Sequence, residues 1–181
     1  MVQPCMNADF AESQRLAPDQ ILEIRERARK DASEVLKQHW DLNYYPVDPV
    51  KIAREIGAEV FWGDLVEDFD GMLIPARAGD LPQIYVDTDC TIERSRFTTA
   101  HELGHLIEDG DEVQVDRRRD ARTRAGTDPH EVYANEFAAS LLMPEFAIRQ
   151  LRAVGMPDYK MADFFAVSMA ALKNRLNNLG I

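Results

Sequence analysis

The motif His101-Glu102-Leu103-Gly104-His105 constrains the fold of this chain more than any other part of its sequence. Two histidines four residues apart share a face only on a helix, where their Cβ atoms lie roughly 6 Å apart. Apolar residues accompany the motif at helical spacing: Phe97, Ala100, Leu103 and Leu106. This pattern predicts a helix from about Ile92 to Ile107 that packs against the core and holds the motif inside the protein.

The spacing of the two histidines suits a metal centre. Two imidazoles on one helix face can each reach a single Zn²⁺ at about 2.0–2.1 Å. Glu102 lies off the line between the histidines, where its carboxylate can accept a proton from a water molecule at the metal without binding the metal itself. This arrangement is typical of metal-assisted hydrolysis of an amide bond. The alternative is a charged helix face on which both histidines are partly exposed.

A catalytic zinc site needs a third protein ligand beside His101 and His105. The remaining histidines and cysteines are poorly placed for that role, so a carboxylate is the better candidate. Glu131 starts an apolar helix 26 residues after His105, and that helix can cross back against the motif. Spacing alone leaves a second role equally open, because Asp128 and Glu131 also form a capping box at the start of the helix. Glu136 points to a different face, and we expect it to be solvated.

The rest of the chain predicts an α+β fold, in which helices pack with a small sheet of roughly three strands. β-branched or aromatic runs bounded by turn residues predict the strands at Ala58–Trp62, Gly71–Pro75 and Gln83–Asp87. Proline and N-cap signals start helices at Pro18, Pro49 and Pro129, and Gly57 ends the second of them. Three short helices are expected at about 144–153, 159–166 and 168–179. We expect the polar segment 108–128 to be a surface loop.

Length and charge limit the classes of protein that fit. The chain has 181 residues, which suits one domain. We expect a flexible lead-in at 1–17 and a single domain at 18–181, with a small helical C-terminal part at about 144–181. The 32 acidic residues outnumber the 21 basic ones, and the net charge of −11 disfavours binding to nucleic acid or to anionic membranes. Two cysteines, no signal-peptide pattern and no membrane-spanning apolar run predict a cytoplasmic protein.

Two sequence blocks in this order resemble the ImmA/IrrE family of zinc metallopeptidases. The first is Arg94-x-Arg96-Phe97-Thr98-x-Ala100, which runs directly into the histidine motif. The second is Glu131-x-x-Ala134-Asn135-x-Phe137-Ala138-x-x-Leu141-Leu142-Met143-Pro144. Similarity at Phe165–Gly180, and a weaker match at Asp48–Gly57, extend the resemblance to roughly residues 45–180.

The resemblance implies an α+β fold with a gluzincin-like metallopeptidase core. In that core His101, His105 and Glu131 would bind one zinc ion, and Glu102 would be the general base. The resemblance also implies a cytoplasmic endopeptidase that cuts a regulatory protein. The typical substrate is a helix-turn-helix repressor of a mobile element, a toxin–antitoxin pair or a stress-response circuit. A toxin held by a cognate antitoxin is a further possibility that the sequence leaves open.

Three further residues are candidates for supporting roles near the expected zinc site. Asn135 is a candidate for orienting a zinc ligand. Tyr133 and His130 are candidates for stabilising the oxyanion of the reaction, although each has a simpler structural role open to it.

Residues 160–180 have the spacing of a helix-turn-helix. The alternative function is therefore a non-catalytic regulator or toxin component that binds a protein partner or DNA through this segment. Its later helix carries only Lys173 and Arg175 as basic residues, which favours a packed helical pair or a docking site for the substrate.

Overall fold

Seven helices and four short strands make up the part of the chain that the computed structural model describes, which is residues 16–65, 69–77, 79–109, 114–117 and 128–181. The helices are α2 (Pro18–His39), α3 (Pro49–Ile56), α4 (Ile92–Asp109), α5 (Pro129–Leu142), α6 (Glu145–Ala153), α7 (Asp158–Phe165) and α8 (Met169–Leu179). The strands are β1 (Glu59–Gly63), β2 (Phe69–Ile74), β3 (Gln83–Asp87) and β4 (Gln114–Arg117). The predicted α+β class is confirmed. Most of the expected lead-in, at 1–17, lies outside the described residues.

The helix boundaries follow the local signals of the sequence. The Asp48 side chain accepts hydrogen bonds from the backbone N–H groups of Val50 and Lys51, so it caps the start of α3. Gly57 ends that helix with φ at +100°, a conformation that glycine adopts without steric cost. Asp128 caps α5 in the same way, by accepting from the N–H of His130 at 3.0 Å.

The sheet has the strand order β1-β3-β2-β4. β1 pairs with β3 in parallel, whereas β2 is antiparallel to both β3 and β4. The three predicted strands are present, and a fourth short strand lies in the segment 108–128 that was predicted to be a loop. This prediction was wrong for Gln114–Arg117, which forms a strand because its backbone pairs with β2. Strand preference depends on such neighbours, and a polar four-residue run does not show it in the sequence. Residues 118–127 of that segment lie outside the described part of the chain.

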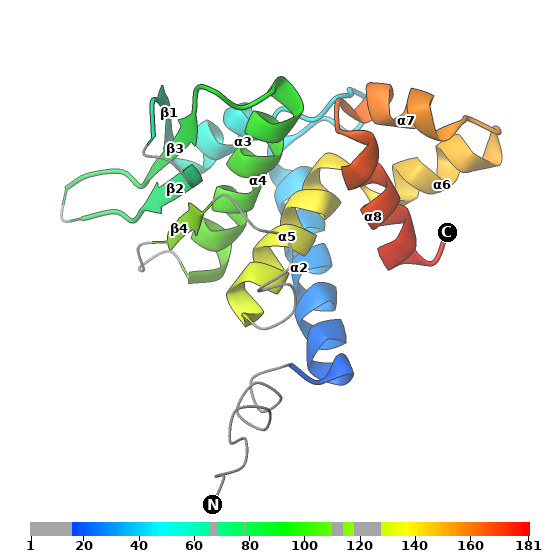
Figure 1. Cartoon of the computed structure of the whole chain (residues 1–181), viewed down its shortest axis with the longest axis horizontal. Helices are drawn as coiled ribbons and strands as arrows, with labels where there is room; N and C mark the ends of the chain where they lie inside the picture. Colours follow the sequence, from blue (N-terminus) through cyan, green and yellow to red (C-terminus); the bar gives the residue numbers. More distant parts are fainter. Residues whose placement is uncertain (1–15, 66–68, 78, 110–113, 118–127) are drawn as a thin grey trace, which may run out of the picture.

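α5 is the central element of the fold. It lies between α2 and α4, while α4 also packs on strands β2 and β3 (Figure 1). Eight of its residues are buried: Tyr133, Ala134, Glu136, Phe137, Ala138, Ser140, Leu141 and Leu142. A helix buried almost all round is normally apolar, so the charged Glu136 needs partners inside the protein. Because α5 packs along α4, Glu131 in the first turn of α5 lies beside α4.

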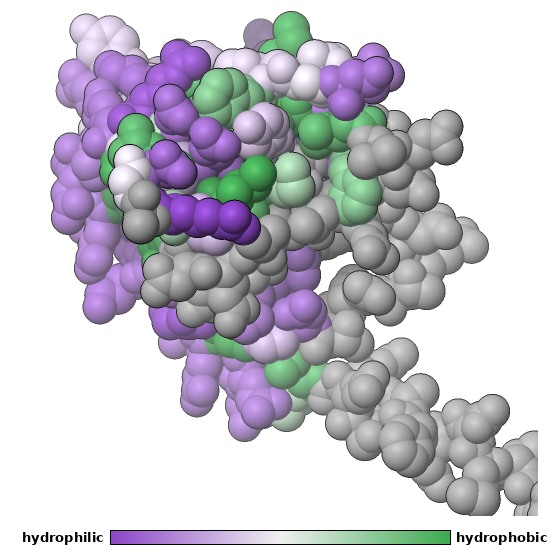
Figure 2. Space-filling model, turned by 90° about the vertical axis from the view of Figure 1, so that its left-hand side faces the viewer, coloured by the Kyte–Doolittle hydropathy of each residue, from purple (hydrophilic) through white to green (hydrophobic). Residues whose placement is uncertain are grey.

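The C-terminal helices α6, α7 and α8 lie at the end of the molecule opposite the sheet (Figure 1). Ile148 of α6, Phe165 of α7 and Leu172 of α8 belong to the same buried core as residues of α2 and the strands. On the side where the sheet lies, the described surface is mainly hydrophilic, with small hydrophobic groups between the polar ones (Figure 2). None of the described helices combines the length and the apolar character needed to cross a membrane.

Candidate metal centre

α4 brings the two motif histidines together as their spacing predicts. The Nε2 atoms of His101 and His105 lie 3.1 Å apart, and the two rings are nearly perpendicular, at 84°. Both side chains are buried, with exposed fractions of 1% and 3%. The alternative of a charged face with partly exposed histidines is therefore wrong. Two ring nitrogens this close and this buried require either a shared proton or a common cation.

Glu131 supplies a third donor from the first turn of α5. Its carboxylate oxygens lie 3.8 Å from Nε2 of His101 and 3.5 Å from Nε2 of His105. One ligand atom from each of the three residues lies within 4.8 Å of the others. Donors bound tetrahedrally at about 2.0–2.1 Å from one ion are about 3.3–3.4 Å apart. The observed separations of 3.1, 3.5 and 3.8 Å, the last two to different oxygens of Glu131, lie close to this value, so the three residues could hold a single zinc-sized cation.

The close approach of α4 and α5 depends on a residue without a side chain. A Cβ atom on Gly104 would lie 3.2 Å from Cδ1 and 3.3 Å from Cβ of Phe137. Gly104 stands in the middle of the helix despite costing about 1 kcal/mol there relative to alanine. The close approach of Phe137 explains why a glycine stands at this position.

Glu102 occupies the position between α4 and the sheet. Its side chain is fully buried, and a Cβ on Gly71 of β2 would lie 3.2 Å from Oε1 of Glu102. The same Cβ would clash with the Thr98 side chain, so a glycine is needed for β2 to pass this close to α4. The strand therefore encloses the carboxylate on the helix that carries both histidines.

The three supporting candidates occupy different places. The Asn135 side-chain amide donates to the backbone carbonyl of Glu131 at 2.6 Å, so it contacts the backbone of that residue rather than its carboxylate. The Tyr133 hydroxyl donates to Asp31 of α2 at 2.6 Å. Burial, together with that hydrogen bond and the Asp31 charge, raises the pKa of Tyr133. The structure thus directs the Tyr133 hydroxyl towards α2.

The imidazole of His130 lies against Glu108, one turn beyond the motif on α4. The separation between His130 Nδ1 and Glu108 Oε2 is 3.3 Å, and Arg27 of α2 forms an ion pair with the same carboxylate. Burial raises the pKa of Glu108, while Arg27 and His130 act in the opposite direction. His130 therefore belongs to a link between α2, α4 and α5 at the edge of the candidate site.

Two arginines before the motif anchor α4. Arg94 pairs with the buried Asp70 of β2. Arg96 instead donates to backbone carbonyls, including Val47 at 2.6 Å and Ala166 at 3.1 Å. The first helix turn is thereby tied both to the sheet and to the end of α7, which fixes the direction from which the histidines project.

Sequence reasoning missed the environment of Glu136, which was expected to be solvated. Glu136 is buried, and Arg175 of α8 donates to its Oε1 at 2.5 Å while Arg29 of α2 donates to the same oxygen at 2.7 Å. The signal was present in the sequence, since an acidic residue inside an otherwise apolar helix must find a buried cation. Its partners Arg29 and Arg175 lie on α2 and α8, which are more than a hundred residues apart in the chain. The periodicity of a single helix cannot identify such partners.

A family model described as the IrrE N-terminal-like domain, Peptidase_M78, matches residues 65–177. The matched region contains the motif, Glu131 and the C-terminal helices almost to the end of α8. A comparison with curated proteins finds no match.

Proposed function

The chain belongs to the ImmA/IrrE family of metallopeptidases, and from this premise we propose that it is a zinc-dependent endopeptidase. The observation that carries the proposal is the convergence of His101, His105 and Glu131 from two helices, at separations that suit one cation. Two neutral imidazoles and a carboxylate are a common ligand set for catalytic zinc, and they leave a fourth position for water or substrate.

Glu102 is the proposed general base. A zinc ion bound to the three ligands would supply Lewis-acid activation of the scissile carbonyl and of a water molecule. The Glu102 carboxylate would take a proton from that water and deliver it to the leaving amine. Its full burial between α4 and β2 supports this role, because an enclosed carboxylate is held in one place and shielded from bulk water.

We propose a regulatory protein as the substrate, in particular a helix-turn-helix repressor of a mobile element, a toxin–antitoxin pair or a stress-response circuit. This follows from the family resemblance, as does a cytoplasmic location. A cognate antitoxin as partner is the neighbouring possibility. The acidic net charge of −11 is consistent with a protein rather than a nucleic acid as the partner.

The alternative function, a regulator that binds DNA through residues 160–180, has less support. Arg175 is one of the two basic residues in α8, and it is 2% exposed because it pairs with Glu136 and donates to the carbonyl of Met143. Lys173 is thus the one basic side chain of α8 on the surface. A recognition helix normally presents several cations to the phosphates, so α8 fits a packing or docking role better.

The test compares the zinc-loaded wild type with Glu102→Gln, using as substrates the helix-turn-helix repressors encoded beside the protein. Cleavage is followed by intact mass, and zinc content is measured in the same samples. Glu93→Gln is the matched control, because Glu93 is an exposed glutamate of the same helix. We expect Glu102→Gln to keep its zinc and to lose cleavage by at least about 100-fold, while Glu93→Gln behaves as wild type. Cleavage by Glu102→Gln at the wild-type rate would contradict the proposal.

A further inference from the structure

A cavity of about 340 Å³ lies between α2, α5, α6 and α8. Ser140, on its wall, follows Glu131 by nine residues on α5, which is roughly 13–14 Å along the helix axis. The cavity is therefore separate from the candidate metal centre, although α5 contributes to both. Its size falls within the range of roughly 300–1,000 Å³ that is usual for small-molecule sites.

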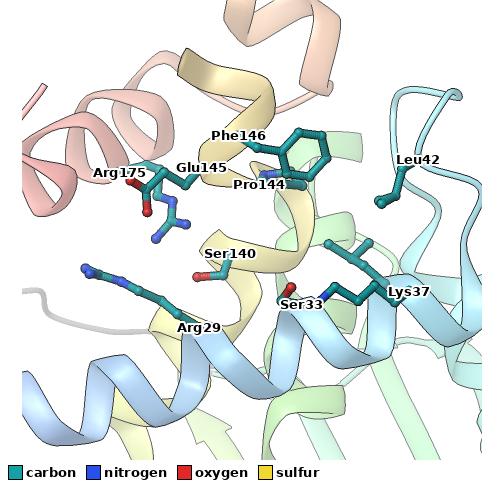
Figure 3. Close-up of a pocket in the computed structure, with 10 residues that line it drawn as sticks. Arg29, Ser33, Lys37, Leu42, Ser140, Pro144, Glu145, Phe146 and Arg175 are labelled. Carbon is teal, nitrogen blue, oxygen red and sulfur yellow. The ribbon is translucent and has the colours of Figure 1, made fainter. Parts of the chain in front are cut away.

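The polar side of this cavity carries an excess of positive charge. Arg29 and Arg175 line it, and Figure 3 shows their guanidinium groups beside the same space. Both pair with Glu136, and Arg25 lies 3.7 Å from that carboxylate as well. Three guanidinium groups thus lie around Glu136, so this carboxylate neutralises only part of their charge. The carboxylate of Glu145, at the same cavity, also acts electrostatically on Arg175. In a protein with a net charge of −11, such a local surplus of cations favours an anionic ligand at this cavity over the rest of the surface.

Ser140 adds an unused hydrogen-bonding group. Its side chain is 5% exposed, and its hydroxyl has no hydrogen-bond partner among the described residues. In Figure 3 the hydroxyl lies on the side of α5 that faces the two arginines. A buried hydroxyl without a partner costs about 1–3 kcal/mol, which a ligand that accepts its hydrogen bond would recover.

The opposite side of the cavity is apolar. Leu42, Pro144 and Phe146 line it, and Phe146 remains 44% exposed despite its size. Glu145 also lines the cavity, but its carboxylate is paired with Arg149 at 2.7 Å. Lys37 of α2 is exposed at the same cavity and adds a further cation. One wall therefore suits an anionic group and the other an apolar body.

We propose that this cavity binds a small organic anion, with a carboxylate or phosphate group on an apolar body. The anionic group lies against Arg29 and Arg175 and accepts a hydrogen bond from Ser140. The apolar body packs on Phe146 and its neighbours. Glu136 and Ser140 belong to α5, which carries Glu131 in its first turn. A ligand in the cavity would therefore contact the same helix that supplies the third donor of the candidate metal centre.

The experiment measures binding to the full chain by calorimetric titration with three probes that share a phenyl group: phenyl phosphate, phenylacetate and neutral 2-phenylethanol. We expect saturable binding of at least one anion and much weaker binding of the alcohol. The two anions distinguish a phosphate ligand from a carboxylate ligand.

Two variants test the location without disturbing the Glu136 cluster. Ser140→Ala removes the hydroxyl and should weaken anion binding by about fivefold, without loss of thermal stability. Lys37→Gln should weaken it roughly two- to fivefold. Lys173→Gln is the matched control, since it removes an exposed cation from α8 outside the cavity, and it should bind as wild type.

Three results would overturn the proposal. The first is that neither anion binds saturably, and the second is that the neutral alcohol binds as tightly as the anions. The third is that Ser140→Ala and Lys37→Gln leave anion binding unchanged. None of these results bears on the zinc site, so failure here is distinguishable from failure of the proposed peptidase function.

Discussion

A Cβ atom on Gly104 would lie 3.1 Å from the Cα of Ala134, closer than most real contacts of a Cβ atom. The backbones of α4 and α5 therefore meet at this point. Gly104 immediately precedes His105, and Ala134 lies one turn after Glu131. The contact between these two small residues sets the distance across which the histidines and the carboxylate face each other.

Gly104→Ala should therefore destabilise the protein, although alanine favours helices. Overpacking of a filled interior costs about 1–3 kcal/mol, which exceeds or offsets the ~1 kcal/mol gained in helix propensity. Chemical denaturation should show a net loss of up to about 2 kcal/mol together with weaker zinc binding. Gly63→Ala is the control, because nothing lies within 4 Å of a Cβ there. A Gly104→Ala variant that is about 1 kcal/mol more stable than wild type would contradict this packing.

Glu136→Gln should be strongly destabilising. The change leaves the buried Arg175 and its arginine neighbours without their countercharge, and breaking a buried ion pair typically costs about 3–5 kcal/mol. The measurement is the free energy of unfolding in urea. Glu145→Gln removes an exposed i,i+4 pair with Arg149 and should change it by less than about 0.5 kcal/mol. Equal effects of the two variants would show that Glu136 is solvated after all.

Tyr133→Phe separates a structural role from a catalytic one. The lost hydrogen bond to Asp31 should lower the free energy of unfolding by about 1.5–3 kcal/mol, the usual contribution of a bond to a charged group. The kcat of the zinc-loaded enzyme should remain within about twofold of wild type. A loss of kcat near 100-fold with unchanged stability would instead assign Tyr133 to oxyanion stabilisation.

Cys90 should react slowly with alkylating reagents. Burial, the Asp70 charge and the hydrogen bond from its thiol to Asp70 raise the pKa of Cys90 to about 11, against an opposing effect of Arg94. At pH 8 only about one thiol in a thousand is then ionised, compared with about a quarter for an ordinary cysteine.

The measurement is the pH dependence of iodoacetamide labelling in a Cys5→Ser background, which makes Cys90 the only thiol. The rate should rise with a midpoint near pH 11. Asp70→Asn should lower the midpoint, because it removes a negative charge that favours the neutral thiol. A midpoint between pH 8 and 9 in the folded wild type would contradict the described environment.

Local signals predicted much of the architecture. Proline after an N-cap aspartate marked the starts of α3 and α5, Gly57 marked the end of α3, and the four-residue step between His101 and His105 predicted their shared face. These features depend on neighbours within one or two turns, which is why the sequence reveals them.

Features that depend on distant segments could not be predicted in this way. β4 forms only because β2 offers an edge, and its own four residues carry little strand preference. The direction of the Tyr133 hydroxyl is decided by Asp31, 102 residues away in the chain. The burial of Glu136 depends on arginines from α2 and α8. The role of Glu131 was only partly predictable. Its spacing left metal ligation and helix capping equally open, and only the packing of α5 on α4 brings its carboxylate to the histidines.

Zinc affinity in the wild type and in Glu131→Gln, measured by competition with a chromophoric chelator, shows whether Glu131 completes a zinc site with His101 and His105. We expect about one zinc ion per wild-type chain and an affinity at least about tenfold weaker in Glu131→Gln, with both proteins folded. Stoichiometric zinc bound by Glu131→Gln with wild-type affinity, or no zinc bound by the wild type, would contradict the proposed site.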